Sequence, residues 1–103
     1  MALYTIIMEY AGGTYISQIN ANSPKAASLK WAQKIDTTQI SRFGEKAKQS
    51  LILQIKEDIP SQLKGILNGW CVTAQLSGGL ALINLIKTEN DKKIAEQKNR
   101  GDR

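Results

Sequence analysis

The chain has 103 residues, of which 42% are hydrophobic and 22% are charged, and its net charge at pH 7 is +5. This composition excludes collagen-like, low-complexity and wholly disordered chains, and the length is enough for one hydrophobic core. No apolar run approaches the ~18 residues of a membrane span, and no basic segment leads an apolar one at the start of the chain. We therefore expect a cytoplasmic protein of one domain without a membrane partner.

Residues 3–21 predict a β-hairpin that reverses at Gly12-Gly13. Paired glycines between strand-like runs supply the positive φ angles that a tight turn requires. With the turn at these glycines, four cross-strand pairs share one apolar face of the hairpin. The predicted pairs are Tyr10 with Tyr15, Met8 with Ser17, Ile6 with Ile19, and Tyr4 with Ala21.

The pattern becomes helical after Ser23-Pro24, which combines an N-cap residue with proline at the first helical position. Ala27, Trp31 and Ile35 follow at four-residue spacing, so they lie on one face of the helix. We therefore expect an amphipathic helix that packs this face against the sheet.

A second helix is predicted from Asp36, because Asp36 and Gln39 resemble a capping box. Gly44 weakens this helix by about 1 kcal/mol relative to alanine. A strand over residues 50–55 is the alternative, since this segment contains a continuous apolar run; an apolar arc that extends to both sides favours the helix. That arc consists of Ile40, Phe43, Ala47, Leu51 and Ile55. Residues 61–67 are expected to form a short third helical turn.

Residues 70–87 predict a second hairpin, with its turn at Gly78-Gly79. One face is continuously apolar. Its predicted pairs are Leu76 with Ala81, Ala74 with Ile83, and Val72 with Leu85. Leu80, Leu82 and Ile86 fall on the opposite face, and either the third helical turn or another subunit must cover them. These three residues form a candidate interface.

Strand pairs and helices are segregated in the order ββ-αα-ββ, which indicates an α+β fold. We expect residues 1–89 to form one domain, a four-stranded antiparallel sheet with two helices, or three with the third turn, packed on one face. Residues 90–103 contain one aliphatic side chain, Ile94, and eight charges. This composition predicts a frayed helix or a disordered tail.

The sequence lacks the residue types and pairings that are typical of active sites. It has no histidine, so the commonest metal ligand and general base is absent, and its single cysteine, Cys71, cannot form an internal disulfide. A site of four Cys and His ligands is excluded, and no two acidic residues form a convincing catalytic pair. Neither glycine pair precedes a helix as a phosphate-binding loop would. We expect no cofactor, no metal and no enzymatic activity, with Cys71 as a small packing residue.

The edge of the sheet suggests a protein partner instead. The strands within residues 3–21 carry Glu9 as their only charge and contain no lysine or proline, so they lack the usual protection against pairing with another strand. We therefore expect a small interaction or regulatory module that acts through a protein partner or a homo-oligomer.

A basic helix surface is the alternative site. The two predicted helices supply cations that could meet phosphate groups. These candidates are Lys30, Lys34, Arg42, Lys46 and Lys56. No exposed aromatics lie between basic residues on a strand, as RNA-binding sheets require. Nucleic-acid binding is therefore the alternative and not the favoured function.

A Tyr- and Thr-rich strand and a glycine hairpin are followed by a polar-capped helix with alanines near its start. The residues are the run from Tyr4 to Tyr15, YTIIMEYAGGTY, and then Ser23-Pro24-Lys25-Ala26-Ala27. This first quarter of the chain resembles the opening of HicB-type antitoxin domains. The resemblance implies binding and neutralisation of a small RNA-cleaving toxin, often with a DNA-binding segment appended. No residue role is carried over from that family.

Overall fold

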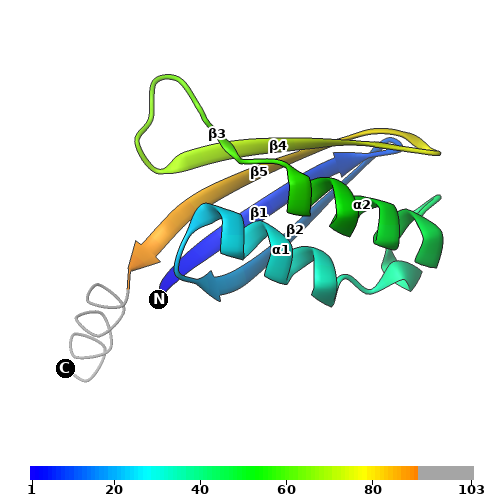
Figure 1. Ribbon diagram of the computed structural model, residues 1–103, viewed down its shortest axis with the longest axis horizontal. Helices are drawn as coiled ribbons and strands as arrows, with labels where there is room; N and C mark the ends of the chain where they lie inside the picture. Colours follow the sequence, from blue (N-terminus) through cyan, green and yellow to red (C-terminus); the bar gives the residue numbers. More distant parts are fainter. Residues whose placement is uncertain (91–103) are drawn as a thin grey trace.

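Two helices lie across one face of a single antiparallel sheet in the computed structural model, which describes residues 1–90 (Figure 1). The strand order is β2-β1-β5-β4-β3. The strands are β1 (Ala2–Tyr10), β2 (Gly13–Ala21), β3 (Ser61–Gln62), β4 (Gly69–Leu76) and β5 (Gly79–Asn90); the helices are α1 (Pro24–Lys34), the 3-10 helix η1 (Thr37–Gln39) and α2 (Glu45–Glu57). The α+β fold is confirmed, but the sheet has five strands where four were predicted.

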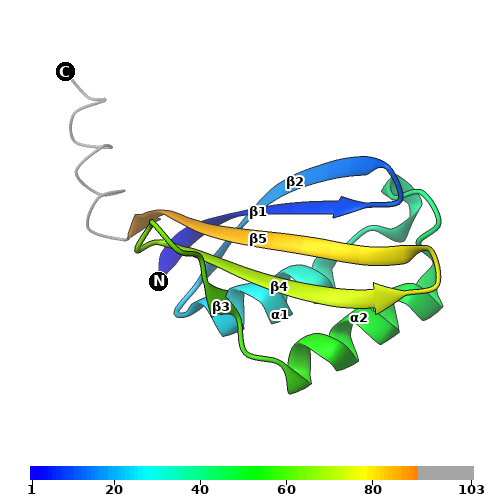
Figure 2. The same ribbon diagram turned by 90° about the horizontal axis from the view of Figure 1, so that it is seen from above.

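The core lies between the sheet and the two helices, which cover the same face (Figure 2). The neighbouring strands β1 and β5 contribute side chains with no exposed surface: Ile6, Met8, Ile83 and Leu85. α1 adds Trp31, which is 7% exposed, and α2 adds Leu51 and Ile55. The alternation of buried and exposed residues along the strands therefore produces one covered face and one open face.

The first hairpin turns one residue earlier than predicted. Ala11 and Gly12 form the turn, with φ angles of 49° and 79°, and Gly13 begins β2 opposite Tyr10. Two positive φ angles in succession are characteristic of the type I′ hairpin turn. The predicted pairs were wrong by two residues; the observed ones are Met8 with Tyr15, Ile6 with Ser17, Tyr4 with Ile19, and Ala2 with Ala21. A shift of two keeps every side chain on its predicted face.

The second hairpin is shifted in the same way. Its turn is Ser77–Gly78, and the observed pairs are Leu76 with Gly79, Ala74 with Ala81, and Val72 with Ile83. A Cβ atom on Gly78 would overlap the hydroxyl group of Tyr10. That hydroxyl accepts from the Gly78 N–H at 3.0 Å and donates to the Arg42 carbonyl at 2.8 Å. Gly78 therefore lets the Tyr10 hydroxyl approach the backbone of the turn closely. Gly79, with φ at 123°, begins β5.

The first helix begins as predicted. Ser23 Oγ accepts from the Ala26 N–H at 3.1 Å, and Pro24 occupies the first helical position. The second helix begins later than predicted, because Asp36 caps η1 instead, and Arg42, at φ 55°, lies between η1 and the N-cap residue Gly44. Residues 50–55 lie within α2, so the strand alternative for this segment is wrong.

The predicted third helical turn over residues 61–67 is wrong. Ser61 and Gln62 form the short strand β3, opposite Cys71 and Trp70. The loop that follows is closed by hydrogen bonds from the Leu63 N–H to the Gly69 carbonyl and from Gln62 Nε2 to the Leu67 carbonyl, both 2.9 Å. These bonds satisfy backbone groups that a helical turn would have satisfied internally.

The beginning of β1 lies beside the end of β5. Ala2 pairs with Asn90, with an irregularity between Leu3 and Tyr4. β5 therefore extends three residues beyond the predicted hairpin. The predicted charged tail, apart from Asn90, lies outside the described residues.

Lys25 ties α1 to the end of α2. Its Nζ donates to the carbonyls of Ile55, Lys56 and Asp58, the Lys56 bond being 3.0 Å. Carbonyl groups at a helix C-terminus have no partner within the helix and interact favourably with a cation.

We expect Lys25→Met to lower the free energy of unfolding by about 1–2 kcal/mol, because the end of α2 loses its cationic donor. Chemical denaturation followed by circular dichroism measures the change. Lys46→Met is the control, since it removes a lysine from the first turn of the same helix, where a cation opposes the helix dipole. An equal loss of stability in both variants would contradict this role for Lys25.

Candidate functional site

The sheet has two outer edges, and a side chain closes one of them. At the β4 edge, the side chain of Gln54 from α2 makes two hydrogen bonds to the backbone of Gln75. Its Nε2 donates to the Gln75 carbonyl and its Oε1 accepts from the Gln75 N–H, each at 2.9 Å. β3 covers Trp70 and Cys71 on the same edge. An amide side chain that pairs like a strand residue blocks the approach of another strand.

The edge of β2 is open. In an antiparallel pair, backbone hydrogen bonds join every second pair of opposed residues. The two-residue turn makes Tyr10 and Gly13 the first bonded pair, so the odd-numbered residues of β2 bond to β1. The backbone N–H and C=O groups of the even-numbered residues of β2 therefore point away from β1. One of these outward groups has a partner, because Lys30 Nζ donates to the Asn20 carbonyl at 2.8 Å. Within residues 1–90, the outward N–H and C=O groups of Thr14, Ile16 and Gln18 have no partner. This segment is a strand edge ready to pair.

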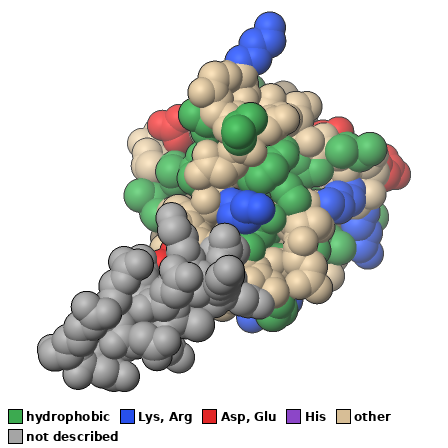
Figure 3. Space-filling view, turned by 90° about the vertical axis from the view of Figure 1, so that its left-hand side faces the viewer, with side chains coloured by type: hydrophobic (Ala, Val, Ile, Leu, Met, Phe, Trp, Pro, Cys, Tyr) green, Lys and Arg blue, Asp and Glu red, His purple; other side chains and the backbone are tan. Residues whose placement is uncertain are grey.

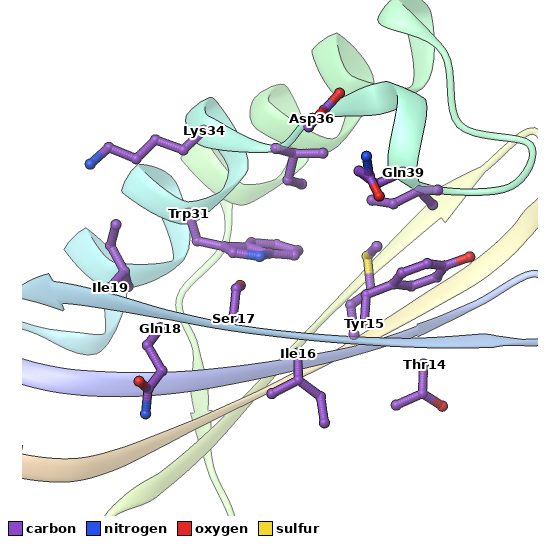
Figure 4. A pocket seen from close by; sticks show the side chains of 13 residues that line it. Thr14, Tyr15, Ile16, Ser17, Gln18, Ile19, Trp31, Lys34, Asp36 and Gln39 are labelled. Carbon is purple, nitrogen blue, oxygen red and sulfur yellow. The ribbon is translucent and has the colours of Figure 1, made fainter.

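A groove runs beside this edge, between β2 and α1, and encloses about 460 Å³. Its apolar wall contains Trp31, Ile35 and Ile40. Figure 4 shows the Trp31 indole between α1 and β2, with Ser17 directed toward it. Tyr15 lies on the same side of β2 with its ring turned away from Trp31, and Thr14, Ile16 and Gln18 are directed to the other side of the strand. The indole N–H donates to none of the residues that the structure describes. This wall of the groove is therefore apolar and contains one unused hydrogen-bond donor.

Polar side chains form the rim of the groove: Lys34, Asp36 and Gln39. The pKa of the Asp36 carboxyl lies below its ordinary value, chiefly because the Thr38 hydroxyl donates to it at 2.6 Å and secondly because the Thr38 N–H donates at 3.0 Å. Asp36 is therefore ionised at neutral pH, and the rim carries one charge of each sign. β2 itself contains no charged residue.

The three predicted interface residues lie on the open face of the sheet, away from both helices. Leu80 is 56% exposed, and Leu82 and Ile86 are partly buried. Ile7 and Ile16 lie opposite each other on the same face, and Ile16 is 66% exposed. No helix among residues 1–90 covers this face, so the predicted cover by a third helical turn is absent there.

The five basic candidates do not form one patch. Lys30 donates to β2, Lys34 lies at the groove, and Arg42 precedes α2. Lys46 and Lys56 lie at opposite ends of α2, roughly 15 Å apart along its axis. In the view of Figure 3, basic side chains occur as separate spots among hydrophobic and neutral ones.

Cys71 lies on β4, partly buried, and burial raises the pKa of its thiol. The thiol is therefore protonated at neutral pH and a poor nucleophile. Among the described residues, no three His, Cys, Asp or Glu side chains converge as metal ligands would. No helix within this range is long and apolar enough to cross a bilayer.

We expect Gln54→Leu to accelerate amide hydrogen exchange at Gln75 by up to about tenfold, because the Gln75 N–H loses its only acceptor. Exchange followed by NMR measures this residue directly. Gln49→Leu, an exposed position on the same helix, is the control and should leave Gln75 unchanged. Unchanged exchange in Gln54→Leu would show that the edge is closed in another way.

We expect Thr38→Val to raise the pKa of Asp36 toward its ordinary value, because the carboxylate loses its first hydrogen-bond donor. A pKa lowered in the folded state means that ionised Asp36 stabilises the fold above its unfolded pKa. This contribution is lost as the pH falls through the folded pKa. NMR titration of the Asp36 carboxyl measures the midpoint. Thr38→Ser keeps the hydroxyl and should keep the low value; a low midpoint in Thr38→Val would contradict the assignment.

Comparison of the chain with protein-family models, with curated proteins and with solved structures finds no match. Its function is therefore inferred from the geometry of the β2 edge and the groove.

Proposed function

We propose that this protein is a small, non-enzymatic interaction module that binds an extended segment of another polypeptide along the edge of β2. The observation that carries the proposal is the row of unpaired backbone groups at Thr14, Ile16 and Gln18, with an apolar groove beside it. Strand addition to an open edge takes its affinity from backbone bonds and its specificity from pockets for alternate side chains. A cytoplasmic location fits the lone thiol at Cys71.

The groove defines what the bound segment should look like. A strand paired with β2 directs every second side chain to the helix side of the sheet, toward Trp31, Ile35 and Ile40. The preferred ligand therefore has apolar residues at alternate positions. A polar atom that reaches the Trp31 N–H adds orientation, and Lys34 and Asp36 at the rim accept a ligand charge of either sign.

Nucleic-acid binding is supported less well. The amino groups of Lys25, Lys30 and Lys48 already donate to backbone carbonyls within the fold. The remaining candidates are spread over α1 and both ends of α2, while phosphate recognition needs several cations together. The resemblance to HicB-type antitoxin domains stays a prediction, and it agrees with a protein partner.

We expect Ile16→Pro to weaken peptide binding by about tenfold or more, because proline removes the outward N–H at the centre of the edge. The Ile16 N–H makes no bond to β1, so the fold tolerates this proline. The probe is a peptide selected with the purified protein from a random library displayed on phage. Binding is measured by Trp31 fluorescence in a Trp70→Phe background.

Thr73→Pro is the matched control. It lies on the opposite edge, two residues from Gln75, and its N–H also faces outward. Selected peptides should bind Thr73→Pro normally and should protect the amides of Thr14, Ile16 and Gln18 from hydrogen exchange. Equal loss of binding in both variants, or protection elsewhere in the chain, would overturn the proposed site.

A further inference from the structure

We propose that the strand occupying this edge is β2 of a second copy of the chain, paired antiparallel about Ile16. This inference rests on the proposed function, because it uses the same edge and names its partner. The pairing would join two five-stranded sheets into one continuous sheet with a two-fold axis at Ile16.

The first argument is the symmetry of the free backbone groups. The hairpin turn limits the free edge at one end, and at the other end Lys30 Nζ donates to the Asn20 carbonyl. The residues left between them, Thr14, Ile16 and Gln18, are arranged evenly about Ile16. In a two-fold pair, Ile16 faces the partner's Ile16, and Thr14 faces the partner's Gln18. Each such pair exchanges two hydrogen bonds, so every free group at these three residues finds a partner.

The second argument is charge. β2 contains no charged side chain, so two copies meet without like charges facing each other across the new strand pair. A strand edge that avoids self-pairing would normally carry a lysine, a proline or an inward charge. β2 has none of these, while the β4 edge is closed by Gln54.

The third argument is the open face. Ile7 and Ile16 are cross-strand neighbours there. With Ile16 opposite the partner's Ile16, four isoleucines form an uninterrupted row across the new sheet. Directly opposed residues of an antiparallel pair lie on the same face, so both helix layers also lie on one side. The two grooves then open toward each other across the axis, each with its own Trp31.

Ile16→Lys tests the pairing. It places two lysines opposite each other on the axis, and we expect it to weaken the dimer by about tenfold or more. Leu80→Lys is the matched control, because it makes the same change at an exposed residue of the same face but on β5. Light scattering over a concentration series measures dimerisation, and thermal unfolding verifies that both variants fold.

The wild-type chain and Leu80→Lys should form dimers, Ile16→Lys should be mostly monomeric, and a synthetic peptide of residues 13–21 should compete for the dimer. In the wild type, amide protection at Thr14, Ile16 and Gln18 should rise with concentration. A monomeric wild type, or dissociation by Leu80→Lys and not by Ile16→Lys, would overturn the inference. In the monomeric case the proposed function stands separately if selected peptides still bind at β2, and falls with it if they do not.

Discussion

The pairing of β1 with β5 is the interaction on which the rest of the structure depends. It joins residues about eighty positions apart in the sequence and unites two local hairpins in one sheet. Such a contact must repay the entropy of closing a long loop, and the fully buried side chains of Ile6, Met8, Ile83 and Leu85 on these strands supply the compensation. It also decides which strands lie outside: β2 on one side, and β4 with its short neighbour β3 on the other.

Which residues face the core could be read from the sequence, because side chains alternate along a strand and an error of two residues does not change the face. The register could not. The sequence predicts a Gly-Gly turn in both hairpins, yet Ala11 adopts a positive φ in the first turn and Ser77 is part of the second. In each hairpin the second glycine is a strand residue. Glycine pairs indicate where a chain reverses, while the surrounding contacts decide which residue turns.

The candidate site was foreseen only in part. The absence of lysine and proline in residues 3–21 indicated an unprotected edge, and β2 has one, although β1 lies inside the sheet. The helical spacing of Trp31 and Ile35 predicts that they pack in the core, and spacing does not reveal that they also line a groove. The closure of β4 by Gln54 has no sequence signal, because it depends on how α2 is placed over the sheet. The distinction between the two edges is a tertiary property.

The meeting of Ala2 with Asn90 has a consequence for how the chain could be connected. Since the two positions are neighbours on adjacent strands, a short linker between them would span little distance. The backbone could then be reopened at Ser77–Gly78, between two strands that stay hydrogen-bonded to each other. A circularly permuted gene would thus encode the same arrangement of strands with β5 first and β4 last, and the exposed edge of β2 would be untouched by either new end.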